Sequence, residues 1–182
     1  MTAFHSGSSL SRMHDARDAT FVSVTAVDRR RIEAQGFLGL GDREIAQIKF
    51  WLRLSPAICM TWAACGTALH SAPVLWVLAP FALLGTLLPG HPFDLLYTFG
   101  IRRLTGGPAI PRYPLPRRFA CLLATLMLVG AAWSFQSGSI LAGQLFGWGL
   151  VSAALVNVTT GFCIPSFLYG LLFGPPGSCQ IE

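Results

Sequence analysis

The sequence predicts an all-α integral membrane protein, and three observations carry this prediction. First, 53% of the 182 residues are hydrophobic and only 12% are charged, which is about half the charged share of an ordinary soluble domain. Second, apolar runs occupy most of the chain after residue 53. Third, the arginines flank these runs, as the positive-inside rule requires. The net charge of +5 therefore indicates contact with a membrane surface. It does not indicate nucleic-acid binding, for which the sequence carries no motif.

Residues 1–41 are expected to form a polar N-terminal arm that is partly disordered, because serine, glycine and charged residues dominate its first half. That half lacks the continuous apolar segment of a cleavable signal peptide, so the membrane spans themselves are expected to direct insertion. Arg29, Arg30 and Arg31 form a basic run, which we expect to lie in solvent beside anionic lipid headgroups.

Residues 42–53 are expected to form an amphipathic helix at the membrane interface. Ile45, Ile48 and Leu52 recur at helical spacing, which places them on one face of such a helix. Asp42 is expected to be the N-cap, since its side chain can accept hydrogen bonds from the free N–H groups of the first turn.

Residues 54–173 are expected to form a transmembrane domain of four helices, arranged as two hairpins. The predicted spans cover about residues 54–70, 74–89, 119–135 and 140–160. The first two are short for a bilayer that requires about 20 residues, so one buried helical hairpin is the alternative to two separate spans.

The loop of residues 90–118 is dense in proline and glycine, which interrupt regular helix. It is also strongly basic, and four of its arginines are expected to face lipid headgroups, namely Arg102, Arg103, Arg117 and Arg118. Every Lys and Arg lies either before residue 54 or in this loop. The arm, the loop and the C-terminal tail (174–182) are therefore expected on the cytoplasmic side of a bacterial inner membrane.

Asn157, Thr159 and Thr160 place polar side chains at membrane depth near the end of the last predicted span. One interpretation is hydrogen bonding between helices, or from each threonine back to its own helix. The other is a small polar pocket beside Pro165, which is expected to bend or end the helix because it lacks a backbone N–H.

Cys163 is the candidate reactive thiol. The alternative is a small buried hydrophobic residue, which is what most free cysteines are. Reactivity requires a helix N-terminus or a cation near the sulfur, and Cys121, expected on the same side of the membrane, is a candidate neighbour. His70 and His91 lie outside the centres of the predicted spans and are expected at the interface. No cysteine and histidine cluster with the spacing of a metal site is present.

Three segments, residues 92–97 (PFDLLY), 116–120 (PRRFA) and 157–169 (NVTTGFCIPSFLY), resemble the uncharacterised bacterial family called domain of unknown function 4395. The resemblance covers about residues 54–172 and implies four transmembrane helices and no established activity. It further implies a second cysteine three residues after the first, and genes beside those of thioredoxin- or rhodanese-type proteins. Here that second position is Ser166, so a local disulfide cannot form.

Two classes of function are compatible with these features. The leading hypothesis is a non-catalytic accessory subunit of a larger respiratory or photosynthetic membrane complex, because catalytic groups are few and Gly143, Gly147 and Gly149 allow close helix packing. The alternative is a thiol- or sulfur-handling membrane protein that uses Cys163 with a thioredoxin- or rhodanese-like partner. Small-solute transport is a weaker third idea, since the spans carry no charge. Bound lipid is the expected non-protein component, whereas no residue supports pigment or haem.

Overall fold

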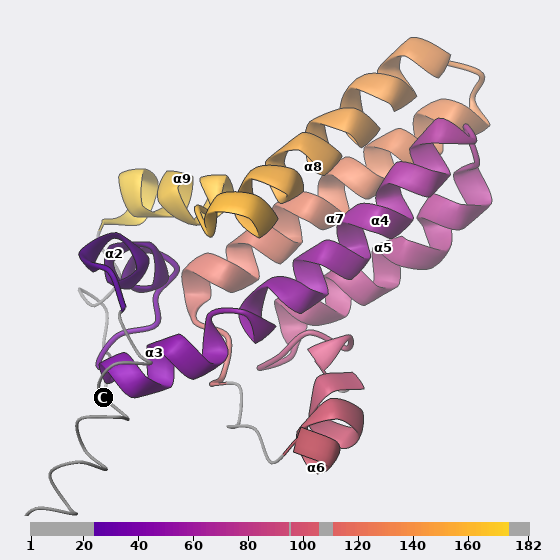
Figure 1. Ribbon diagram of the computed structural model, residues 1–182. Coiled ribbons are helices and arrows are strands. Elements are labelled where there is room, and N and C mark those ends of the chain that lie inside the picture. The colour runs from indigo at the N-terminus through magenta and orange to yellow at the C-terminus, as the bar shows by residue number, and fades with distance from the viewer. Residues whose placement is uncertain (1–23, 95, 106–110, 175–182) are drawn as a thin grey trace, which may run out of the picture.

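A computed structural model describes residues 24–94, 96–105 and 111–174, and every regular element within these ranges is helical. Four long helices, α4, α5, α7 and α8, form an elongated bundle (Figure 1). The short helices α2, α3 and α9 gather at one end of this bundle, and α6 lies beside the same end. The opposite end holds only two short turns. The predicted all-α class is thus confirmed for the described residues.

The bundle consists of two helical hairpins. In the first, α4 (Leu54–Ala68) and α5 (Ala72–Leu87) are joined by a turn in which His70 has a positive φ of 49°. In the second, α7 (Leu115–Gln136) begins before the expected residue 119 and turns at Gly138 into α8 (Ile140–Thr160). The hairpins close into a ring, because α5 packs on α7 and α4 packs on α8.

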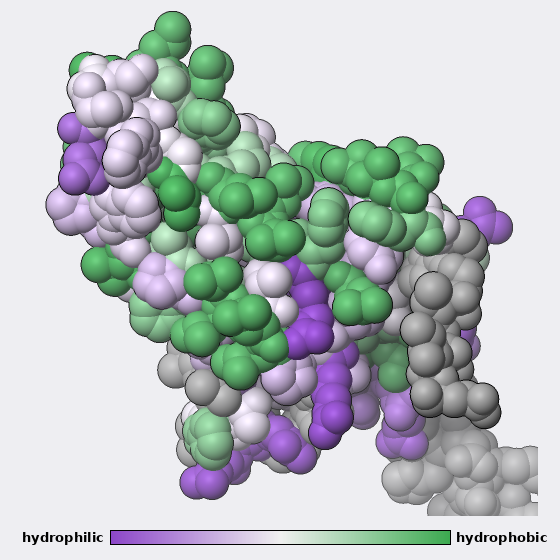
Figure 2. All heavy atoms as spheres, turned by 180° about the vertical axis from the view of Figure 1, so that it is seen from behind, coloured by the Kyte–Doolittle hydropathy of each residue, from purple (hydrophilic) through white to green (hydrophobic). Residues whose placement is uncertain are grey.

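Two of these helices, α7 with 22 residues and α8 with 21, are long and apolar enough to cross a membrane. Helices α4 and α5 have only 15 and 16 residues. Large apolar side chains cover the outside of the bundle, and Figure 2 shows them over the bundle and over α9. Leu141 and Leu145 on α8 are 75% and 68% exposed, whereas water would favour burying them.

Small residues let the helices approach closely inside the bundle. Gly147 of α8 lies against Thr67 of α4, so closely that a Cβ atom on Gly147 would be 2.5 Å from Thr67 Cγ2 and 2.9 Å from its Cβ. Gly143 lies against Phe135 in the same way. These glycines therefore pack within the chain. Leu75, Leu78 and Leu128 fill the centre of the bundle and are almost completely buried.

The expected partial disorder of the N-terminal arm concerns mainly residues 1–23, which lie outside the described residues. Residues 24–53 form a folded cap over one end of the bundle, and we refer to this cap as the arm. It comprises α2 (Ala26–Ala34), α3 (Asp42–Ile48) and the 3₁₀ turn η1 (Trp51–Arg53). A small apolar cluster holds these pieces together, consisting of Ile32, Phe37, Ile45, Ile48 and Leu52. The expected helix over residues 42–53 is thus divided between α3 and η1.

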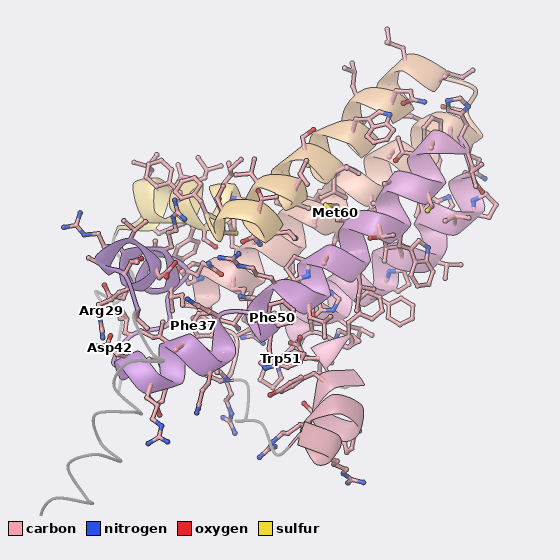
Figure 3. All side chains as sticks on the ribbon, viewed as in Figure 1. Arg29, Phe37, Asp42, Phe50, Trp51 and Met60 are labelled. Atoms are coloured by element: carbon pink, nitrogen blue, oxygen red, sulfur yellow. The ribbon has the colours of Figure 1, made fainter. Side chains whose placement is uncertain are left out.

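The expectation that Asp42 caps α3 is wrong. Gly41 occupies the N-cap, and its N–H is bound by the carboxylate of Glu44. Asp42 is the first helical residue and instead accepts a hydrogen bond from Arg29 of α2 at 2.5 Å. Figure 3 shows these two side chains next to each other at the outer edge of the cap. An aspartate in the first turn still favours the helix through the backbone dipoles.

Helix α8 ends at Thr160, in agreement with the predicted span 140–160, but Gly161 and not Pro165 ends it. Gly161 has a φ of +74°, a left-handed conformation that ends helices and strongly favours glycine. Pro165 lies in the first turn of α9 (Ile164–Phe173), where its missing N–H costs nothing. Between the hairpins, residues 96–105 form the π-helical turn η2 (Leu96–Ile101) and α6 (Arg102–Thr105).

The contact between Gly147 and Thr67 leads to a stability prediction. Gly147→Ala should lower the free energy of unfolding by about 1–3 kcal/mol, because the new methyl group forces α4 and α8 apart. Denaturant unfolding of the purified protein in mild detergent measures the change. Gly170→Ala in α9 is the matched control, since no atom lies within 4 Å of its Cβ position. Equal stability of the two variants would contradict the close approach of α4 and α8.

Candidate functional site

A cavity of about 190 Å³ lies inside the bundle near the end that the arm covers. Its walls are mostly aliphatic side chains from the four long helices, including Met60 of α4, which Figure 3 labels. The cavity is partly open to the exterior. Its polar and thiol-bearing lining residues are Gln35, Ser55, Cys59, His91, Tyr113, Arg117, Cys121, Asn157 and Cys163.

Three cysteines from three different elements line this cavity. Cys59 lies on α4, Cys121 on α7, and Cys163 at the N-cap of α9. Cys121 interacts electrostatically with both of the others. Cys65 is exposed elsewhere on α4 and does not line the cavity. The structure therefore brings Cys163 and Cys121 to one site, and it adds Cys59, which had not been singled out from the sequence.

His91 is buried inside the protein, with 4% of its surface exposed, and its expected depth at the membrane interface stays a prediction. Its ring lies against Gly85 of α5, where a Cβ atom would be 2.5 Å from His91 Cδ2 and 3.2 Å from Cys121 Sγ. A glycine is required at this position to admit the ring. His91 Nε2 lies 3.7 Å from Cys59 Sγ, so His91 stands close to two of the three thiols.

The hydrogen bonds of His91 show which of its ring nitrogens carries the proton. The Nδ1 atom accepts from the N–H of Phe93 at 3.3 Å, and burial lowers the pKa of His91 from 6.5 to about 4, although nearby Asp94 opposes this shift. The ring is therefore neutral at pH 7, with its proton on Nε2. His91 thus presents an N–H donor, not a free base, to Cys59.

Arg117 carries a buried guanidinium, with 5% of its residue surface exposed, which overturns its expected position at the lipid headgroups. Its Nη1 donates to Gln35 Oε1 at 3.0 Å, and its Nη2 donates to the Leu52 carbonyl and, at 3.4 Å, to the Tyr113 hydroxyl. In a continuous helix the Leu52 carbonyl would accept from residue 56, which is Pro56 and has no N–H. Arg117 supplies the missing donor.

Tyr113 and Asp94 extend this network across the cavity end. Burial raises the pKa of Tyr113, Arg117 opposes the shift, and the charge and hydrogen bonding of Asp94 add to it. Asp94 accepts from the Ser55 hydroxyl and, at 3.1 Å, from the backbone N–H of His91. A continuous set of polar contacts therefore links the arm, the loop and α4.

Gln35 joins the arm to the site. Its side-chain oxygen accepts from Arg117, and its nitrogen donates at 2.9 Å to the carbonyl of Gly161, at the end of α8. Gln35 itself is 6% exposed. The arm thus contributes one wall of the cavity and holds the cation beside it. A glutamine in a short helix carries no sequence signal of such a role.

The polar side chains at the end of α8 make different contacts. Thr159 and Thr160 both bond back to α8, to Leu155 and Val156, each at 2.7 Å. Asn157 lines the cavity instead. Ser166, at the position where the resemblance implied a second cysteine, is 2% exposed and donates to the Pro116 carbonyl at 3.2 Å. It fastens α9 to the start of α7.

Several other arginines bind the ends of helices. Arg31 donates to the Thr160 carbonyl, and Arg53 donates to the Val158 carbonyl at 3.2 Å, both at the C-terminus of α8. Arg118 donates to the Leu87 carbonyl at the end of α5. Cations at these positions complement the partial negative charge of a helix C-terminus. For Arg30, Arg102 and Arg103, the headgroup contact stays a prediction.

Among the residues that the structure describes, no three Cys, His, Asp or Glu side chains are arranged to hold a metal ion. The chemistry that the site offers is therefore that of thiols, of one neutral imidazole and of one buried guanidinium. Of the carboxylates in residues 24–94, 96–105 and 111–174, none lines the cavity, and Asp94 is turned toward its own donors.

The lowered pKa of His91 predicts a pH dependence of stability. Between pH 6.5 and 4 the unfolded chain binds a proton at His91 that the folded protein does not. The free energy of unfolding should therefore decrease as the pH is lowered through this range, by about 3 kcal/mol in total. Denaturant unfolding at pH 7, 6 and 5 measures the slope. His91→Asn should remove most of it, whereas His70→Gln, on the turn at the far end, should retain it. An unchanged slope in His91→Asn would contradict the burial of this ring.

Comparison with known proteins gives one match. No curated protein and no solved structure shows significant similarity to this chain. A family model described as Domain of unknown function (DUF4395) matches residues 50–173, a range that includes the four long helices, α9 and every cysteine of the cavity. Gln35 lies outside the matched range. The chain belongs to the DUF4395 family.

Proposed function

We propose that the protein is a multi-pass protein of the bacterial inner membrane, with four spans and with the arm end of the bundle facing the cytoplasm. The exposed apolar surface of the bundle supports insertion. The 3₁₀ turn η1 leads directly into α4, which lengthens the first span toward the 20 residues that a bilayer requires. The basic arm and loop lie at one end of the bundle, which supports the orientation.

Within this membrane protein, the function that the geometry favours is the handling of a thiol or a small sulfur compound. The observation that carries the proposal is the convergence of Cys59, Cys121 and Cys163 on one cavity. A single buried cysteine is usually a small hydrophobic residue of the core, but here three cysteines from α4, from α7 and from the N-cap of α9 line one cavity. Arg117 lies on the same cavity, and its positive charge opposes, without cancelling, the cost that burial imposes on a thiolate at Cys121.

The corresponding reaction is thiol–disulfide exchange. The thiolate of Cys163 attacks one sulfur of a small disulfide that enters the cavity, and the other sulfur leaves as a thiol. The thiolate of Cys121 then attacks the mixed disulfide, which releases the second thiol and leaves a disulfide between the two cysteines. A thioredoxin-like partner would reduce this disulfide again. Cys121 thus takes the resolving role that Ser166 cannot fill.

A non-catalytic accessory subunit of a larger membrane complex is the second candidate. The exposed apolar surface of α9 favours it, because Leu171, Leu172 and Phe173 are each more than 60% exposed. Gly143 and Gly147 give it no support, since they pack against Phe135 and Thr67 of the same chain. Co-purification with a stoichiometric membrane complex from native membranes would support this candidate.

Disulfide trapping tests the thiol proposal. Native membranes that contain the protein are treated with dipyridyl disulfide, free thiols are blocked with N-ethylmaleimide, and peptides are identified by mass spectrometry. We expect a disulfide between Cys121 and Cys163, because both residues line one cavity. Cys65 should appear alkylated or as a pyridyl adduct.

Two matched variants complete the test. Cys163→Ser should abolish the internal disulfide and leave a pyridyl adduct on Cys121, whereas Cys65→Ser should change nothing. The thiol proposal is wrong if Cys121 and Cys163 never pair and Cys163→Ser leaves the labelling of every other cysteine as in the natural sequence.

A further inference from the structure

A second, much smaller cavity of about 20 Å³ lies at the polar end of the first. Gln35 and Asn157 line both cavities and form the boundary between them. The walls on the far side of this boundary are mainly polar and come from the arm and from the end of α8. They are Asp28, Arg31, Ile32, Lys49, Leu52, Arg53 and Gly161.

The charges around this boundary are strongly unbalanced. Four cations surround it, Arg31, Lys49 and Arg53 at the small cavity and Arg117 at the large one. The one carboxylate on the walls, Asp28, lies 3.4 Å from Lys49 and is neutralised by it. Within the described part of the chain, Arg117 forms no ion pair with a carboxylate.

The acceptors that bind Arg117 directly are all neutral, and the Asp94 carboxylate acts on it only from beyond ion-pair distance. Burial of this guanidinium therefore still costs part of its hydration. An anion at the boundary would offset this cost. The large cavity beyond Arg117 is almost entirely aliphatic, which suits a hydrocarbon chain and not a small hydrophilic ion. The two cavities together thus match a molecule that is apolar along its length and negative at one end.

We propose that these cavities bind a single-chain anionic amphiphile, a long-chain carboxylate. The chain lies along the aliphatic walls of α7 and α8, which include Met127, Leu150 and Ala154. The carboxylate lies at Gln35 and Asn157, facing Arg117 and Arg53. The small cavity has room for about one water-sized group, which selects a carboxylate over a bulky phosphodiester headgroup. This site does not depend on the reactivity of any cysteine.

The bilayer is the source of such a ligand. The cavity is partly open, and α7 and α8, which supply about half of its lining residues, are the two helices that are long enough to cross a membrane. An amphiphile dissolved in the lipid phase therefore reaches the aliphatic wall without passing through water.

Thermal unfolding of the full chain in nanodiscs of zwitterionic lipid tests the proposal. Palmitate is added and compared with hexadecanol, which has the same chain without the charge, and with acetate, which has the charge without the chain. Palmitate should raise Tm by several degrees, whereas hexadecanol and acetate should have little effect. An equal rise of Tm with hexadecanol would refute the claim that the site binds an anionic head group. An equal rise with lysophosphatidic acid would refute the claim that it selects a carboxylate.

Variants locate the site. Ala154→Leu fills the aliphatic cavity without removing any polar contact and should abolish the rise of Tm with palmitate. Arg117→Gln should also abolish it, if that variant folds. Leu141→Ala, on the exposed face near the far turn, is the control and should retain the shift. A full shift in Ala154→Leu would show that palmitate binds elsewhere and would refute the proposal. Disulfide trapping is carried out without palmitate, so failure of the thiol proposal is seen separately from failure of this one.

Discussion

The buried guanidinium of Arg117 is the constraint on which this end of the molecule depends. A charge at this depth is tolerated only where neighbouring groups replace its hydration, and the acceptors come from three separate segments: Gln35 in the arm, Leu52 before α4 and Tyr113 in the loop. The Leu52 carbonyl is available because Pro56 cannot donate to it. One side chain therefore fixes the arm, the first long helix and the loop relative to one another.

This constraint makes the arm part of the site. Gln35 lies outside the range that matches the family, yet it holds Arg117 and binds the end of α8 through Gly161. Arg31 and Arg53 bind neighbouring carbonyls at the same helix end. The arm thus covers the cavity, and removing it would expose a charged group and several unpaired carbonyls at once. Cavity formation and arm docking are therefore a single event.

The sequence predicted the features that depend on local composition, such as the helical class, the apolar runs that became α7 and α8, and the break after Thr160. It could not place His91 or Arg117, because polar residues in a proline-rich basic loop resemble headgroup contacts, and their partners lie 32 and 82 positions away. The end of α8 near residue 160 was predicted, but Pro165 was expected to cause it, whereas Gly161, directly after the last helical residue, ends the helix. Pro56 was the sequence signal that could have indicated the role of Arg117, since a proline at that position leaves the Leu52 carbonyl without a local donor.

The two proposals about the cavity are coupled through its charge. Arg117 is the cation on the wall near Cys121 and Cys163, and it interacts electrostatically with both. A thiolate and a bound carboxylate would each gain from this cation, but in a medium of low dielectric constant two anions beside it would repel each other strongly. Occupancy by an amphiphile should therefore oppose formation of the thiolate. In that case the lipid phase would regulate the thiol chemistry, and the arm, by holding Arg117 in place, would be needed for both.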